Sequence, residues 1–295
     1  MSKIITSGFL TAPVNGIAIN TAFPANVKNF TAQIFRTVGY IVIHYTGNDK
    51  DTALANAKYF QTAGRGASAH FFVDDYNIYQ SVRLKDRAGH CGASAYFHSS
   101  CRNANSAAIE MCCSGGYKVS EQTKENAAQL CARLCEILDI PAADVDKYVL
   151  RHWDVTRKQC PAQMSGANNA EWKAFLKRVV DILYAPPKPL MLIAQETLDG
   201  KWGNGDERRE RLAEAGYDPA EVQKRVNTLC KGGIRVQVTA SVLNIRAAPD
   251  RDSAKLDIFG AGVIVHVEEV RPGNGASAWG RVGNGWVSLD YVREV

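Results

Sequence analysis

A proline cluster at residues 185–189, Ala-Pro-Pro-Lys-Pro, interrupts the chain about two thirds of the way along the sequence. Proline has no backbone N–H and a fixed φ, so this run cannot continue a helix and forms a short, stiff, extended spacer. At 295 residues, the chain is also longer than one typical domain. We therefore predict a multidomain protein, with a large domain over residues 1–184 and smaller modules over 190–231 and 234–295.

The large domain alternates between short apolar runs and segments of helical period, a pattern typical of an α/β fold. The apolar runs predict strands near residues 40–45, 70–74, 78–82, 107–112 and 147–151. Helical periodicity predicts helices over about residues 51–62, 121–138 and 170–184. The natural assembly is a mixed central sheet flanked by helices. Residues 1–37 are weakly patterned and yield no clear prediction.

Three possible metal ligands of the large domain stand in distinctive local settings. His44 closes an apolar run, His152 follows another short apolar run, and Cys160 comes eight residues later. Two imidazoles and a thiolate can form a tetrahedral Zn²⁺ site with one open position, where the pKa of a bound water falls to roughly 7. Spacing alone is weak evidence, because His44 and His152 lie far apart in the chain. A lone cysteine is more often a small core residue.

The surrounding sequence resembles the zinc-dependent N-acetylmuramoyl-L-alanine amidases of the type 2 family, which share a fold with peptidoglycan recognition proteins. The resemblance covers roughly residues 38–184. It departs at Ala107-Ala108, where the family often has Ile-Gly, a change that affects strand packing and not chemistry. Landmarks in the family's order are Ile41-Val-Ile-His-Tyr-Thr-Gly47, Gly66-Ala-Ser-Ala-His-Phe-Phe-Val73, Ile78-Tyr-Gln-Ser-Val82, Gly89-His-Cys-Gly92, Ala107-Ala-Ile-Glu-Met-Cys112 and His152-Trp-Asp with Lys158-Gln-Cys-Pro161.

This resemblance implies a ligand set and a catalytic pair. It assigns His44, His152 and Cys160 as the ligands of a Zn²⁺ cofactor. It makes Glu110 the group that takes a proton from water and passes it to the leaving amine. Lys158 becomes the positive charge that stabilises the developing oxyanion. Taken singly, Glu110 and Lys158 would be interpreted as ordinary surface charges.

The implied reaction is hydrolysis of the amide between N-acetylmuramic acid and L-alanine of the peptidoglycan stem peptide. His70 and His90 fall inside landmarks and are expected to line the cleft, where they contact substrate or orient other groups. Two rival functions remain. One is a non-catalytic peptidoglycan-binding protein, although binding-only members of the superfamily typically lack the cysteine found here at Cys160. The other is a cysteine hydrolase with Cys160 as nucleophile and His152 as base.

Residues 190–231 predict a small helical module, which is too short to bury much apolar area alone. The segment resembles the short three-helix cell-wall-binding repeat of some phage lysozymes. The resemblance implies recognition of the muropeptide, with Trp202 stacking on a sugar face and Asn204 and Arg208 making polar contacts. The alternative is that Trp202 belongs to the core and Arg208 is a surface charge.

Residues 234–295 consist of short β runs separated by Gly, Pro, Asn and Asp, which predict a small all-β barrel. The stretches Leu243-Asn-Ile-Arg-Ala-Ala-Pro249 and Gly285-Trp-Val-Ser288, the latter followed by Tyr291-Val292, resemble bacterial SH3-like wall-binding domains. This resemblance predicts a fold and not a ligand, because Trp286 and Tyr291 could simply pack the barrel.

Composition and charge bear on the binding partners and on the cellular location expected for this protein. The net charge of +5 is mild and favours anionic wall polymers, while no dense basic run points to nucleic acid. No stretch approaches the ~20 apolar residues of a membrane span, and the first residues lack a classical export signal. We expect synthesis in the bacterial cytoplasm and action on peptidoglycan after release, as for a phage or prophage endolysin. A host autolysin is the alternative.

Overall fold

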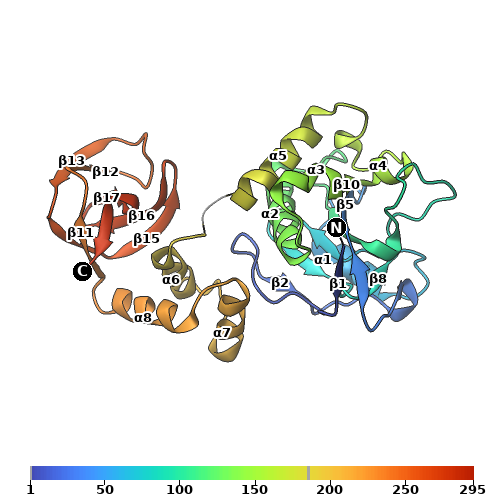
Figure 1. Ribbon diagram of the computed structural model, residues 1–295, viewed down its shortest axis with the longest axis horizontal. Coiled ribbons are helices and arrows are strands. Elements are labelled where there is room, and N and C mark those ends of the chain that lie inside the picture. The colour runs from blue at the N-terminus through green and yellow to red at the C-terminus, as the bar shows by residue number, and fades with distance from the viewer. Residues whose placement is uncertain (1, 185–186) are drawn as a thin grey trace. The chain divides into compact units, whose positions relative to one another are not determined.

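The computed structural model describes residues 2–184 and 187–295 (Figure 1). The chain divides into two compact units, Met1–Ala185 and Pro186–Val295. This division falls within the proline cluster, of which Ala185 and Pro186 lie outside the described residues. Each unit is built around its own hydrophobic core.

The first unit contains a mixed six-stranded sheet, as the sequence predicted. Its strand order is β10-β5-β9-β6-β7-β2. All neighbouring strands are parallel except the antiparallel pair β6 and β7. The strands are β2 (Ile19–Asn20), β5 (Tyr40–Tyr45), β6 (Phe71–Val73), β7 (Ile78–Gln80), β9 (Ser106–Met111) and β10 (Val149–Arg151). The helices are α1 (Ala53–Gln61), α2 (Glu121–Ile137), α3 (Val145–Tyr148), α4 (His152–Thr156) and α5 (Ala170–Tyr184).

Residues of a strand alternate between the two faces of a sheet, and here the two faces have different partners. On one face, Ile41 and Ile43 of β5 join the main core with Leu130 of α2 and Phe175 of α5. The apolar stripe of α5 that the sequence predicted is therefore buried against α2 and the sheet. Packing against these two helices buries this face at β5.

The opposite face carries α1 and leaves room for polar side chains. Phe72 of β6 and Ala108 of β9 pack there against Ala57 of α1. By the same alternation, Glu110 lies on the face of Ala108, and His44 lies beside Glu110 in the strand register. The sheet therefore presents two chemically active side chains where β5 and β9 end.

Several short strands lie in regions where no strand could be predicted from the sequence. Strand β1 (Lys3–Ile5) pairs with β4 (Arg36–Val38), and β3 (Phe30–Thr31) pairs with β8 (Arg87–Ala88). Together with β2, they show that residues 1–37 belong to the first unit. Strands of two or three residues carry too little alternation to be detected in a sequence.

The second unit combines three helices with two antiparallel sheets. The helices are α6 (Leu190–Leu198), α7 (Gly205–Glu214) and α8 (Pro219–Cys230). The sheets have the orders β14-β11-β18 and β13-β12-β17-β16-β15. Their strands are β11 (Ile234–Val238), β12 (Val242–Arg246), β13 (Lys255–Gly260), β14 (Ile264–Val267), β15 (Glu269–Gly273), β16 (Ala276–Val282), β17 (Gly285–Ser288) and β18 (Val292–Glu294).

Helices and sheets of the second unit share one core. Ile193 of α6 and Val222 of α8 belong to the same buried cluster as Val236 of β11 and Val270 of β15. The backbone N–H of Val270 also donates to Gln195 Oε1 of α6 at 3.2 Å. The segments 190–231 and 234–295 are therefore packed as one compact body, which compensates for the small core that either would have alone.

Candidate functional site

The polar residues of the site lie at or just beyond the carboxyl ends of three adjacent parallel strands, at one edge of the sheet. His44 is the penultimate residue of β5, and it lies opposite Glu110 of β9 in the register. On the other side of β5, strand β10 ends at Arg151, and His152 follows directly as the first residue of α4. Ligands of open α/β sheets bind outside the carboxyl ends of the strands, and these residues lie there.

A turn after α4 returns Cys160 to this edge. Helix α4 ends at Thr156, and the following Arg157 has a left-handed φ of 64°. The backbone N–H of Trp153 donates to the Cys160 carbonyl at 2.9 Å. Arg151 fixes the following segment, because its guanidinium donates to the Met164 carbonyl and pairs with Asp154. The Cys160 thiol is therefore held in place by backbone and side-chain hydrogen bonds.

The structure brings together the three predicted metal ligands. His44, His152 and Cys160 are all buried, and one ligand atom from each lies within 4.8 Å of the others. Cys160 Sγ is 3.7 Å from His44 Nδ1, and the two imidazole rings are 4.7 Å apart between centroids. His152 Nδ1 is buried with no hydrogen-bond partner in the described structure. Such an orphaned nitrogen fits a position from which an imidazole binds a metal ion.

The electrostatics of the cluster also fit a divalent cation. Burial lowers the pKa of His44 well below its ordinary value and that of His152 to about 4, so both imidazoles are neutral and offer lone pairs. Burial, reinforced by the charge of Glu110, raises the pKa of the Cys160 thiol to about 12. A thiolate here therefore needs a compensating positive charge. A bound Zn²⁺ supplies that charge and deprotonates a coordinating thiol.

A hydrogen-bond relay fixes the tautomer of His44. The Ser106 hydroxyl donates to the Arg102 carbonyl at 2.7 Å, so it accepts from His90 Nε2 at 3.1 Å. His90 Nδ1 is then unprotonated and accepts from His44 Nε2 at 3.0 Å. The lone pair of His44 Nδ1 is consequently left free on the side of Cys160. This is how a histidine ligand is usually oriented, by a hydrogen bond to its other ring nitrogen.

We expect His90→Ala to lower Zn²⁺ affinity by about 10–100-fold, the usual loss when such a partner is removed. His90→Asn should lose less, because its amide oxygen can still accept from His44. A zinc competition titration on the purified chain measures both, with His266→Ala as a control because that histidine is exposed in the second unit. Wild-type affinity in His90→Ala would contradict the relay.

Of the two roles predicted for His70 and His90, contact with substrate or orientation of other groups, the hydrogen bonds of the structure fit the second. His70 has no exposed surface, and its Nδ1 accepts from the Ala108 backbone N–H at 3.0 Å while Nε2 lies 3.1 Å from the Asp86 carbonyl. It joins β9 to the segment before β8, so the prediction of substrate binding is wrong for His70. His90 uses both ring nitrogens on His44 and Ser106, so it orients a ligand instead of contacting substrate.

Glu110 and Lys158 lie beside the ligand cluster. The Glu110 side chain is 19 % exposed, and its Oε1 is 4.0 Å from His44 Nδ1. Its Oε2 is buried and has no hydrogen-bond partner among residues 2–184 and 187–295. Burial raises the pKa of Glu110 to about 8, against the opposing charge of Lys158. Lys158 is exposed and forms no ion pair within the described residues, yet its charge also lowers the pKa of both histidine ligands.

A cavity of about 500 Å³, which no sequence pattern predicted, opens next to Glu110. It lies between the loop that follows β5, helix α1 and β6. Asn48 and Asp51, just beyond the end of β5, were the only signal in the sequence that polar groups gather here. The lining residues are Thr46, Asn48, Asp51, Ala55, Asn56, Tyr59, Phe60, Phe72 and Glu110.

In the second unit, Trp202 is part of the core. It is 5 % exposed, its indole Nε1 donates to Glu196 Oε2 at 3.2 Å, and its ring meets Tyr217 edge-on. The predicted stacking of Trp202 on a sugar is therefore wrong, and the core alternative holds. Asn204 and Arg208 remain at the surface, where Arg208 Nη2 donates to Asn204 Oδ1 at 2.9 Å. Arg208 also lines a cavity of about 530 Å³ between α7 and α8.

Comparison with known proteins identifies two parts of the chain. Residues 35–163 match the family model described as N-acetylmuramoyl-L-alanine amidase, and residues 192–230 match the model described as CW_7 repeat. The chain thus contains an amidase-family domain followed by a CW_7 repeat. The first match includes all three candidate metal ligands, Glu110 and Lys158.

Individual relatives agree with these matches. The amidase domain is 34% identical over 155 residues to a probable N-acetylmuramoyl-L-alanine amidase of Bacillus licheniformis, a match that covers 48% of this chain and 41% of the relative. It is 30% identical over 154 residues to the amidase CwlL of the same species, with the same coverage. The chain thus spans about two fifths of the length of these curated relatives.

Two further similarities concern the repeat and a solved structure. The repeat is 52% identical over 42 residues to a lysozyme of Streptococcus phage Cp-7, covering 14% of this chain and 12% of the relative. The solved catalytic domain of XlyA is 26% identical and has a TM-score of 0.46, covering 55% of this chain and 99% of that domain.

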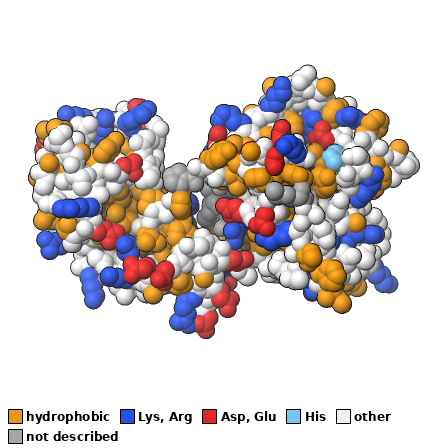
Figure 2. All heavy atoms as spheres, in the orientation of Figure 1, with side chains coloured by type: hydrophobic (Ala, Val, Ile, Leu, Met, Phe, Trp, Pro, Cys, Tyr) orange, Lys and Arg blue, Asp and Glu red, His pale blue; other side chains and the backbone are white. Residues whose placement is uncertain are grey.

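The surface carries charges of both signs. On the face shown in Figure 2, Lys and Arg side chains are interspersed with Asp and Glu side chains over both units. Among the described residues, no helix has the length and apolar character needed to cross a membrane.

Proposed function

We propose that this chain is a zinc-dependent N-acetylmuramoyl-L-alanine amidase that cleaves the amide between N-acetylmuramic acid and L-alanine in peptidoglycan. The observation that carries the proposal is the convergence of His44, His152 and Cys160 beside the carboxylate of Glu110, one oxygen of which has no partner in the described part of the chain. The match of residues 35–163 to the amidase family supports the substrate class.

The chain's own residues supply most of the chemistry. Zn²⁺ held by the three ligands would supply Lewis acidity toward the scissile carbonyl and the attacking water. The positive charges of Lys158 and of the cation would favour the carboxylate form of Glu110, which is placed to accept a proton from that water and to donate it to the leaving amine. Lys158 provides a positive charge for the oxygen on which negative charge develops, an effect of about 3–4 kcal/mol for a single donor. The cavity along α1 is the natural place for the substrate, because Glu110 forms part of its wall.

The rival cysteine-hydrolase mechanism fits this site poorly. A nucleophilic cysteine is accessible and has a lowered pKa. Cys160 is 3 % exposed, and burial raises its pKa to about 12. These properties suit a metal ligand better than a nucleophile.

We further propose that the second unit holds the enzyme on the wall and that the protein is a phage or prophage endolysin. The CW_7 match and its likeness to a phage lysozyme support both points. Arg208 and Asn204 beside the cavity between α7 and α8 are the proposed muropeptide contacts. The β part of this unit is proposed to be an SH3-like barrel. Attachment raises the local substrate concentration without new contacts at the active site.

Product analysis tests the activity. We expect the purified chain, supplied with Zn²⁺, to release new α-amino groups of alanine from purified walls and no new reducing sugar ends. Mass spectrometry of the soluble products should show intact stem peptides separated from muramic acid. Reducing ends without free alanine amines would indicate a glycosidase, and no release at all would contradict the proposal.

A further inference from the structure

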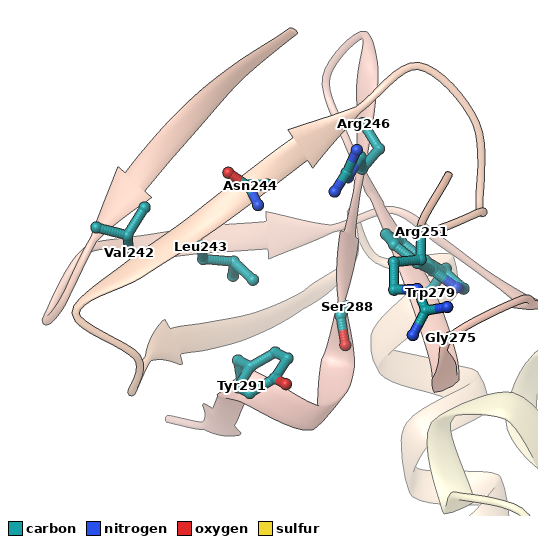
Figure 3. Close-up of a pocket in the computed structure, with 9 residues that line it drawn as sticks. All are labelled: Val242, Leu243, Asn244, Arg246, Arg251, Gly275, Trp279, Ser288 and Tyr291. Carbon is teal, nitrogen blue, oxygen red and sulfur yellow. The ribbon is translucent and has the colours of Figure 1, made fainter. Parts of the chain in front are cut away.

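A cavity of about 410 Å³ opens between strands and loops of the β part of the second unit (Figure 3). Figure 3 shows two arginines, Arg246 and Arg251, near Trp279 at one end and Tyr291 toward the other. No carboxylate is among its nine lining residues. The cavity therefore has a cationic end and an apolar, aromatic end.

Arg246 brings an uncompensated charge to this cavity. It is the last residue of β12 and half-buried, and its Nη1 donates to the Ser253 carbonyl at 2.8 Å. Within residues 187–295, no carboxylate lies within ion-pair distance of it, whereas Arg271 and Arg281 of the same unit are both paired with Glu269. A single carbonyl contact orients this guanidinium and leaves its other donors available.

The loop that contains Arg251 is hydrogen-bonded to the loop that contains Asn274, and these bonds hold Arg251 at the cavity. Its backbone N–H donates to the Asn274 carbonyl at 3.0 Å, and Asn274 Nδ2 donates to Asp252 Oδ2 at 3.1 Å. Gly275 has a φ of 80°, and a Cβ there would lie 2.6 Å from Arg251 Cβ. Glycine is therefore required for the close approach.

The charge of Arg251 is also largely free. Its only ion pair among the described residues is with Asp252, at 3.6 Å between Nε and Oδ1, and both side chains are about two-thirds exposed or more, at 67% and 72%. Exposed pairs of this kind contribute little. The guanidinium can therefore exchange this contact for a ligand.

The remaining lining residues offer aromatic rings and neutral hydrogen-bonding groups to the uncharged part of a ligand. Trp279 is 3 % exposed and fixed by its indole Nε1, which donates to the Asn274 carbonyl at 3.2 Å. Tyr291 is 52 % exposed, so its ring is free to contact a ligand. Asn244 and Ser288 add neutral hydrogen-bonding groups between the two ends.

We propose that this cavity binds an oxyanion, a carboxylate or a phosphate, carried by a polymer of the bacterial wall. Two guanidinium groups facing one space are suited to such planar or tetrahedral anions, because each offers a fork of donors. The inference deepens the proposed wall attachment and names the chemistry that the β part would recognise. It does not depend on amide hydrolysis.

The test uses the full chain carrying Glu110→Gln, so that substrate is not consumed. Two probes distinguish the sources of the anion: poly(glycerol phosphate) for phosphate, and a disaccharide tetrapeptide for carboxylate. The indole N–H signal of Trp279 in NMR reports binding at this cavity. We expect at least one probe to shift it saturably, more weakly as salt is raised.

Charge-removing variants decide the assignment. Arg246→Gln and Arg251→Gln should each raise the Kd at least tenfold, while Arg235→Gln, an exposed arginine on β11 outside the cavity, should change it less than twofold. Arg251 is exposed, so its substitution tests the idea even if Arg246→Gln perturbs folding. The probe that binds identifies the source. The proposal is overturned if neither probe shifts the signal, or if both arginine variants bind as tightly as the parent. Either result would leave the amidase assay unaffected.

Discussion

Glu110→Gln is expected to lower the rate of amide hydrolysis by about 10²–10⁴-fold, the range that a positioned general acid–base group contributes. Glutamine keeps the size of the side chain but can neither accept a proton from water nor donate one to the amine. Glu110 Oε2 has no partner among the residues that the structure describes, so the substitution removes no hydrogen bond seen at that atom. Release of alanine amines from purified walls gives the rate.

Metal binding and stability separate this catalytic role from a structural one. Glu110 is not among the three clustered ligand residues, so Glu110→Gln should bind Zn²⁺ with nearly wild-type stoichiometry and affinity. Glu136→Gln, at a carboxylate of α2 that is 56% exposed, is the matched control and should retain full activity. Full activity in Glu110→Gln would remove this residue from the mechanism. Loss of both activity and metal would make its role structural.

The residues of the candidate site could be predicted to meet at one edge of the sheet, because the strand patterns and the family landmarks agree there. The apolar runs that end at His44 and contain Glu110 became parallel neighbours, β5 and β9. Parallel strands end at the same edge, so residues at or near their ends meet without any local motif. The mixed sheet flanked by helices followed from the same runs, and this part of the fold prediction is confirmed.

Side-chain direction explains what the sequence could not show. His70 lies within a family landmark, but a landmark gives no indication of whether the ring faces the cleft or the interior, and here it faces the interior. Trp202 stands between lysine and glycine, as in an exposed turn, yet its ring is buried with α6 residues such as Ile193. The cavity along α1 likewise depends on the distance between a helix and a loop, which no single segment encodes.

Removal of the metal should abolish activity and destabilise the first unit. We expect hydrolysis to fall to background after complete chelation and to return when Zn²⁺ is added back, because His44, His152 and Cys160 form a site whose thiolate needs a cation. A ligand present at 100 times its Kd stabilises the folded state by about 2.7 kcal/mol. The unfolding transition of the first unit should therefore move to lower temperature without zinc.

The chelation experiment also distinguishes the two possible uses of Cys160. Substitution of Cys160 would inactivate a zinc enzyme and a cysteine hydrolase alike, whereas only the zinc enzyme needs the ion. Cys230 is exposed in the second unit, so Cys230→Ser serves as the control for nonspecific effects at a thiol and should keep its zinc-dependent activity. Full hydrolysis by zinc-free protein, confirmed by elemental analysis, would contradict the metal mechanism and favour the thiol. An unchanged unfolding temperature of the first unit would show that the three side chains do not hold the ion.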